Sequence, residues 1–195
     1  MRIRTLCVFC GSSTGSRPGY AVVARELGRW MAGHGIRLVY GGGKVGLMGI
    51  VADAVLDAGG QVTGVIPDFL KAKEVAHPGL SELIVTGTMH ERKARMAQMA
   101  DAFVALPGGF GTFDELFEIL TWAQLSLHGK PVALFNAEGF YDPLMALARH
   151  GVNEGFIQPG NLEQFALVDS LGALESYLST HVPRTVHKWN DLSKA

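Results

Sequence analysis

Short runs of large apolar residues alternate with longer amphipathic segments along most of the chain. The short runs predict strands, which lie at residues 3–9, 36–40, 61–66, 82–85, 102–106, 131–135 and 165–168. The amphipathic segments predict helices at residues 18–33, 47–58, from 88 onward, 113–127, 142–152 and 171–178, and the aperiodic residues 68–81 predict a short helix and a loop. This alternation is typical of a Rossmann-like, doubly wound α/β fold, in which helices cover both faces of a parallel sheet in three layers.

Length and composition favour an ordinary globular protein with a single domain. The chain has 195 residues, of which 48% are hydrophobic, and its net charge is −1. We expect one domain over residues 1–180, followed by a polar, aperiodic tail over residues 181–195. No charge block indicates nucleic acid or an anionic membrane, and no apolar run approaches the roughly 18 residues that span a bilayer. We therefore expect a cytoplasmic protein without nucleic-acid or membrane partners.

Cys7 and Cys10 form a C-x-x-C pair, a spacing that invites a redox interpretation. The two residues, however, belong to an apolar run that reads as a buried strand. Three residues of strand span roughly 10 Å, which exceeds the Cα separation that a disulfide tolerates. We therefore expect both cysteines to act as small buried hydrophobic residues.

Three of the predicted strands end in glycine-rich turns, at residues 10–15, 41–46 and 107–112. Ligands of open parallel sheets bind at the carboxyl ends of the strands, so three such turns at one edge favour a nucleotide or a sugar phosphate. Gly41, Gly43 and Gly46 match G-x-G-x-x-G, but position 61, where a dinucleotide site needs an acidic residue, is Gln. A P-loop is disfavoured because Val45 follows Lys44 where Ser or Thr is needed.

The turn at residues 107–112 leads into a helix that carries Glu115. Thr112-x-x-Glu115 has the spacing of a capping box, as does Thr88-x-x-Glu91 one helix earlier. The helix shows an apolar stripe with Glu115 opposite to it, and Trp122 and Leu125 lie off that stripe; the stripe consists of Phe113, Leu116, Phe117, Leu120, Gln124 and Leu127. A helix that is apolar on two sides indicates a subunit contact, and hence a homodimer.

Arg92 is an unusual residue because it lies on a methionine-rich helical stripe with Met89, Met96 and Met99. A guanidinium in such a seam needs an anionic partner, since an unpaired buried charge is very costly. The candidates are Glu118, Asp114, Glu115 and a ligand phosphate, and the residue pattern alone does not choose among them.

Taken together, these motifs resemble the Lonely-Guy family of cytokinin-activating phosphoribohydrolases, often mislabelled as lysine decarboxylases. The resemblance covers roughly residues 5–180 and depends on the glycine turn at 41–49, on Met89-His90-Glu91-Arg92-Lys93 and on the stretch from Pro107 to Glu115. It implies a Rossmann-like homodimer that hydrolyses the N-glycosidic bond of a nucleoside 5′-monophosphate, such as an N6-modified AMP. The products would be the free base and ribose 5-phosphate, with no metal or organic cofactor.

The resemblance also implies the roles of individual residues. The family's catalytic arginine and glutamate fall on Arg92 and Glu115. Its substrate-binding positions fall on Glu74, Lys93, Gly108, Gly109, Phe110, Gly111, Thr112 and Thr121. The decarboxylase label would require pyridoxal phosphate, for which no lysine stands in a recognisable setting.

Physical reasoning agrees with a hydrolase, because Glu115 is suited to stabilise an oxocarbenium-like ribose and to activate water. Two alternatives stay open. One is a nucleotide- or cofactor-binding carrier of the same fold that performs no hydrolysis. The other is an NAD-dependent oxidoreductase that uses the glycine turn at 41–46. The walls of the base pocket are not identified, with Met48, Met89 and Trp122 as candidates.

Overall fold

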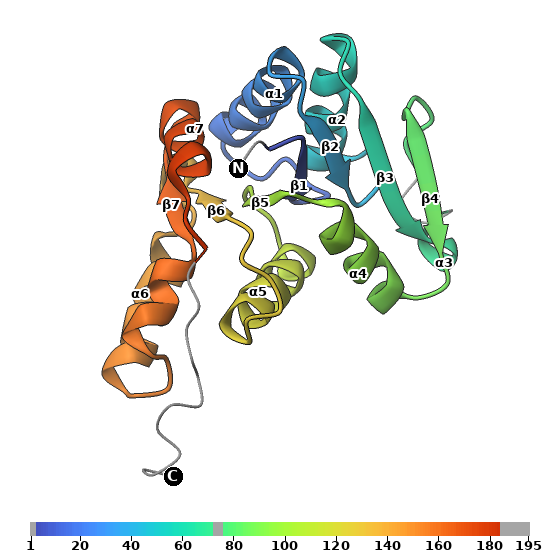
Figure 1. Cartoon of the computed structure of the whole chain (residues 1–195). Helices are drawn as coiled ribbons and strands as arrows, with labels where there is room; N and C mark the ends of the chain where they lie inside the picture. Colours follow the sequence, from blue (N-terminus) through green and yellow to red (C-terminus); the bar gives the residue numbers. More distant parts are fainter. Residues whose placement is uncertain (1–2, 72–75, 184–195) are drawn as a thin grey trace.

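The computed structural model describes residues 3–71 and 76–183, which form a parallel sheet covered by helices on both faces (Figure 1). The strands are β1 Thr5–Phe9, β2 Arg37–Tyr40, β3 Val62–Pro67, β4 Glu82–Thr86, β5 Ala102–Ala105, β6 Val132–Phe135 and β7 Ala166–Val168. The α-helices are α1 Pro18–Gly33, α2 Gly46–Asp57, α3 Asp68–Lys71, α4 Met89–Met99, α5 Phe110–Gln124, α6 Asp142–Asn153 and α7 Leu171–Thr180; the 3₁₀ segments are η1 Ala137–Gly139 and η2 Pro159–Gln164. The α/β fold class predicted from the alternation is therefore confirmed.

The order of the strands creates a crevice at one edge of the sheet. In the order β4-β3-β2-β1-β5-β6-β7, every neighbouring pair of strands is parallel. The chain builds outward from β1 to β4 and then returns to place β5 on the other side of β1. Connections from β1 and β5 thus leave in opposite directions, which opens a space at their carboxyl ends where ligands of such sheets bind.

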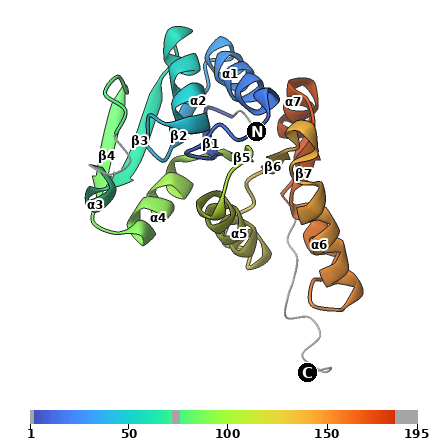
Figure 2. The same cartoon turned by 180° about the vertical axis from the view of Figure 1, so that it is seen from behind.

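Two hydrophobic layers hold the helices against the sheet. Side chains from α1, α2 and α7 pack on one face, and side chains from α4 and α5 pack on the other, where α6 also lies (Figures 1 and 2). Successive residues of β1 alternate between the layers, as the two-residue period of a strand requires. Leu6 and Val8 join the first layer, whereas Cys7 and Phe9 join the second.

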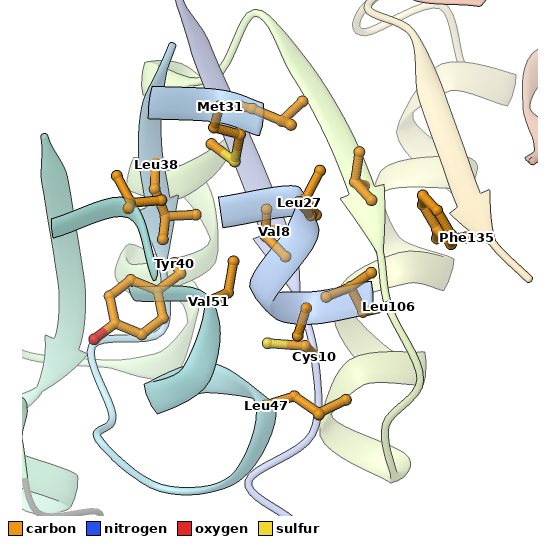
Figure 3. Close-up of a cluster of buried hydrophobic side chains, with 14 of the residues drawn as sticks. Val8, Cys10, Leu27, Met31, Leu38, Tyr40, Leu47, Val51, Leu106 and Phe135 are labelled. Carbon is orange, nitrogen blue, oxygen red and sulfur yellow. The ribbon is translucent and has the colours of Figure 1, made fainter. Parts of the chain in front are cut away.

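The first layer extends to the carboxyl ends of the strands. Cys10 and Leu106, which follow β1 and β5, lie there beside Leu47 at the start of α2 (Figure 3). Cys7 and Cys10 are both buried free thiols and belong to opposite layers. The prediction that they act as buried hydrophobic residues is confirmed.

Two details predicted for the helix that carries Glu115 are wrong. Helix α5 begins at Phe110 with Gly109 as its N-cap residue, so Thr112 and Glu115 lie inside the helix and form no capping box. Its buried face includes Glu115, while Phe117 is 46% exposed; that face consists of Thr112, Glu115, Leu116, Ile119 and Ala123. The apolar period misleads because the side chains beyond this face are also apolar and pack toward α6 or face solvent.

The remaining expectations concern the segments at the periphery. The short helix predicted within residues 68–81 is α3, and residues 72–75 lie outside the described residues. Of the predicted tail, residues 181–183 form no helix or strand, and the rest lies outside the described residues. Within the described residues, no helix is both long and apolar enough to cross a membrane.

His128 connects α5 to β6 through both ring nitrogens. Its Nε2–H donates to the carbonyl oxygen of Ile119 at 2.9 Å, and its Nδ1 accepts from the backbone N–H of Lys130 at 3.2 Å. Burial lowers the pKa of His128, and the positive charge of Lys130 lowers it further. The hydrogen bond to the Ile119 carbonyl raises this pKa but does not outweigh the other two effects. The neutral ring is therefore the form that the fold stabilises.

We expect the free energy of unfolding to fall as the pH drops below about 6.5, where the unfolded histidine takes up a proton before the folded one does. Urea denaturation at a series of pH values checks this for the native chain and for His128→Gln, which removes the titrating ring. The variant should lose part of the acid sensitivity. Identical pH dependence in the two proteins would show that His128 contributes none of it.

Candidate active site

The three glycine turns meet in the crevice between β1 and β5. The N–H of Gly11 in the first turn donates to the carbonyl oxygen of Pro107 in the third, at 3.0 Å. The N–H of Met48, just after the second turn, donates to the carbonyl oxygen of Gly11 at 3.3 Å. The predicted convergence of the turns at one edge of the sheet is confirmed.

Most glycines in these turns are needed for contact within the protein. Gly46 has a φ of +61°, and a Cβ at this position would overlap the backbone of Ser12 and Ser13. A Cβ on Gly108 would overlap the side chain of Thr112 and lie 2.8 Å from the backbone nitrogen of Gly11. These glycines let the turns pack directly on one another.

Gly109 and Gly111 differ from their neighbours, because a Cβ built on either one meets no atom of residues 3–71 and 76–183 within 4 Å. Gly109 is extended and precedes α5, and no side chain in the described part of the chain caps it. The space beside these two glycines is therefore open at the start of α5, where the first N–H groups and the positive end of the helix dipole suit an anion. Phe110, the first residue of the helix, is largely exposed.

Arg92 and Glu115 form a buried ion pair beside this helix start. Arg92 Nη2 lies 3.3 Å from Glu115 Oε1, and the two side chains are only 8% and 10% exposed. Arg92 Nε donates to the carbonyl oxygen of Val65 at 3.0 Å, and Nη1 lies 3.9 Å from the sulfur of Met89. Of the candidate partners for Arg92, the structure thus pairs it with Glu115.

Local sequence signals set the direction of α4, which carries Arg92. Thr88 is the N-cap residue, and its side chain accepts from the N–H of Glu91 while the Glu91 carboxylate accepts from the N–H of Thr88. The capping box predicted at Thr88 is therefore confirmed. It fixes where the helix begins and hence which face Arg92 occupies.

Lys93 pairs with carboxylates other than the one that its neighbour Arg92 contacts. Its Nζ lies 3.0 Å from Asp114 Oδ2 and 3.1 Å from Glu118 Oε1, both on α5. Burial alone would lower the pKa of Lys93, but the hydrogen bonds to Asp114 and Glu118 outweigh that effect and raise it. Lys93 therefore stays charged and ties α4 to α5 beside the Arg92–Glu115 pair.

The thiols near the site are unsuited to nucleophilic chemistry. Burial raises the pKa of both Cys7 and Cys10, and the negative charge of Glu115 raises it further. The thiol form is unreactive compared with the thiolate. No three His, Cys, Asp or Glu side chains of the described residues gather in a way that would hold a metal ion.

Comparison with known proteins identifies the family of this chain. The family model described as "Possible lysine decarboxylase" matches residues 48–178, which is more than half of the chain. A probable cytokinin riboside 5′-monophosphate phosphoribohydrolase of Oryza sativa subsp. japonica is 49% identical over 182 residues, covering 93% of this chain and 80% of the relative. A cytokinin riboside 5′-monophosphate phosphoribohydrolase of Arabidopsis thaliana is 45% identical over 183 residues, covering 94% of this chain and 86% of the relative.

The chain belongs to the cytokinin riboside 5′-monophosphate phosphoribohydrolase family. The resemblance noted in the sequence is therefore confirmed. Among solved structures, the molybdenum cofactor carrier protein of Chlamydomonas reinhardtii superposes with a TM-score of 0.69 at 22% identity, covering 94% of this chain and all of that one. The molybdenum cofactor binding protein of Rippkaea orientalis gives a TM-score of 0.65 at 19% identity, covering 92% of this chain and 98% of the other. At these identities the likeness supports the fold alone.

The structure brings together some of the positions that the phosphoribohydrolase resemblance implies and separates others. Arg92, Glu115, Lys93 and the turn at 108–112 lie around the start of α5. Thr121 lies on another side of α5, where its hydroxyl donates to the carbonyl oxygen of Phe117 at 2.7 Å and lines an apolar cavity of about 280 Å³ between α5 and α6. Glu74 lies outside the described residues, and the binding roles of these residues stay predictions.

The three candidates for the walls of the base pocket lie in two different places. Met48 and Met89 both lie near Arg92. The Met48 sulfur lies beside Gly41, against which the guanidinium packs, and the Met89 sulfur contacts the guanidinium itself. Trp122 instead lines a different cavity together with His128 and Lys130.

Sequence reasoning missed several groups that hold the site of this phosphoribohydrolase family member in place. One is the carbonyl of Val65, which accepts from Arg92 and leaves no signature in a side-chain pattern. Another is Tyr141, which is fully buried and donates its hydroxyl to the carbonyl oxygen of Leu106 at 2.8 Å, just before the third turn. Its place after the glycine-containing segment 137–139 gave no signal for this long-range contact.

Lys93→Met tests whether Lys93 ties α4 to α5. The substitution keeps the length of the stem but leaves the Glu118 carboxylate without its cation, so we expect the free energy of unfolding to fall by about 1–3 kcal/mol. Urea denaturation measures this, with Lys71→Met on α3 as an exposed control that should match the native protein. A raised KM for nucleotide with unchanged stability would contradict a mainly structural role.

Proposed function

We propose that this chain hydrolyses the N-glycosidic bond of a nucleoside 5′-monophosphate, releasing the free base and ribose 5-phosphate. Its relatives named as cytokinin riboside 5′-monophosphate phosphoribohydrolases favour an N6-modified AMP as substrate. The observation that carries the proposal is the buried Arg92–Glu115 pair beside an uncapped helix start, because a carboxylate and an anion site then lie side by side.

The 5′-phosphate is proposed to bind at Gly109 to Thr112. Gly109 and Gly111 face open space, unlike Gly46 and Gly108, whose missing side chains are needed for contacts within the protein. A phosphate there would accept from the first N–H groups of α5 and gain from the helix dipole. Holding the phosphate in this place also fixes the ribose relative to Glu115, which lies farther along the same helix.

Glu115 is proposed to act on the anomeric carbon. As the bond from C1′ to the base nitrogen breaks, its electron pair leaves with the base and positive charge develops on the ribose. The Glu115 carboxylate would stabilise that charge and accept a proton from the water whose oxygen bonds to C1′. That proton then passes to the departing base, so the products are the neutral base and ribose 5-phosphate.

Arg92 is proposed to orient Glu115. Its guanidinium is fixed by the Val65 carbonyl, so the carboxylate beside it has a defined position before substrate binds. A guanidinium suits this role because it stays charged even where it is buried.

Glu115→Gln is the decisive variant for this mechanism, because the amide keeps the shape but loses the charge and the base. We expect kcat to fall by roughly 100- to 10,000-fold. Free base is quantified by liquid chromatography with AMP and N6-isopentenyl-AMP as substrates, and the Kd of AMP, measured by calorimetry, should change little. Glu26→Gln on the exposed side of α1 is the control.

The same assay separates the alternatives. Near-normal turnover by Glu115→Gln would refute the catalytic assignment. Nucleotide binding by the native protein without any release of base would favour a carrier. Binding of NAD without release of base would favour an oxidoreductase. The ratio of kcat/KM for the two nucleotides tells whether the N6 substituent matters.

We also propose that the chain acts as a homodimer in the cytoplasm. Large apolar side chains of α5, α6 and the segments that follow them are exposed, including Phe117, Leu127, Leu147 and Phe156, and the apolar cavity that Thr121 lines lies between α5 and α6. Burial of such a surface favours association. The two free thiols are those of a reducing compartment. Light scattering should give twice the chain mass, and Phe117→Asp should give the mass of a single chain.

A further inference from the structure

Gly41 follows β2 directly and lies against the guanidinium of Arg92. A Cβ built on Gly41 would overlap Arg92 Nη2 and lie 3.3 Å from the sulfur of Met48. Gly41 is not among the glycines with positive φ, so its backbone conformation does not require glycine. What requires glycine at this position is the space that the guanidinium occupies.

The nitrogen that a side chain at residue 41 would displace is the one that pairs with Glu115. Nη2 lies 3.3 Å from Glu115 Oε1, while Nε of the same planar group donates to the Val65 carbonyl. Because the guanidinium is rigid and planar, Nη2 cannot move aside without turning or shifting the whole group. Either movement changes the distance between Arg92 and Glu115 or breaks the hydrogen bond to Val65.

Gly46 of the second turn and Gly49, which follows it in α2, have a different role. Side chains at Gly46 and Gly49 would overlap backbone atoms, of Ser12 and Ser13 and of Lys44 respectively. Displacing backbone atoms costs much free energy, so these glycines are needed for folding. At Gly41 the obstructing atom is the end of a side chain, so the backbone can keep its path and only the contacts of the guanidinium are disturbed.

We propose that Gly41 is a positioning residue for the hydrolysis: the missing side chain admits the guanidinium of Arg92 to the place from which it holds Glu115. The first glycine of the G-x-G-x-x-G motif thus makes room for a cation of the protein itself, whereas in a dinucleotide-binding motif it serves the tight turn. This inference rests on the proposed function, since it assigns Gly41 a part in the same reaction.

Gly41→Ala should lower kcat by about 100-fold, the usual order for a displacement of about 1 Å at a reacting group. KM should stay near its native value because the phosphate site is not disturbed. The melting temperature should fall no further than in Arg92→Ala, because the backbone keeps its path and only the contacts of the guanidinium change. The matched control is Gly33→Ala at the end of α1, where φ is not positive and a Cβ meets no atom of the described residues within 4 Å. A native kcat in Gly41→Ala would overturn the proposal.

A double-mutant cycle decides whether Gly41 acts through Arg92. In the background of Arg92→Ala, Gly41→Ala should cost nothing more, since the group it would displace is gone. An equal loss in both backgrounds would show that Gly41 serves something other than Arg92, and would overturn the proposal.

A measurement without turnover separates this inference from the proposed function. The Nε–H of Arg92 should give a slowly exchanging NMR signal in the native protein because it donates to Val65, and Gly41→Ala should accelerate its exchange. If the native enzyme releases no base, the proposed function fails, and this signal alone decides whether Gly41 positions Arg92. Equal exchange rates in the native protein and in Gly41→Ala would overturn the positioning role.

Discussion

The buried ion pair between Arg92 and Glu115 is the constraint around which this structure is arranged. Removing two charges from water is costly, and their mutual attraction compensates only where the geometry is good and further hydrogen bonds are made. Here the guanidinium also donates to the Val65 carbonyl, so its burial is supported from β3 as well as from α5. Such pairs add little to stability compared with apolar packing. A gain in stability alone therefore does not explain its presence in the interior.

The topology of the sheet supplies the setting for that pair. Because β5 returns to the side of β1 opposite β2, helices α4 and α5 flank β5 on the same face, and their side chains meet below the crevice. The glycines then separate into two groups. Gly11, Gly46 and Gly108 bring the turns into contact, and Gly109 and Gly111 leave the helix start open. The close packing of the first group is what fixes the position of the open space next to Glu115.

The fold was predictable because apolar strands with buried faces leave a strong and local signal. The start of α5 was not, because Thr112 and Glu115 match a capping box although the helix begins at Phe110. The orientation of Glu115 could not be predicted from the sequence either. Its burial is compensated by Arg92 from another helix, which is itself held by a backbone carbonyl of β3. Neither contact is encoded in the periodicity of α5 itself. The glycine motifs located the site, but which glycines face a ligand depends on distances between turns.

The neighbouring residues Arg92 and Lys93 show how the pairing of charges is made specific. Consecutive positions on a helix point about 100° apart, so the two cations face different parts of α5. Lys93 engages both Asp114 and Glu118, which were the alternative partners for Arg92. With those two carboxylates occupied by a flexible ammonium, the planar guanidinium is left to Glu115. The contacts of Lys93 with Asp114 and Glu118 thus leave Glu115 as the carboxylate that Arg92 holds.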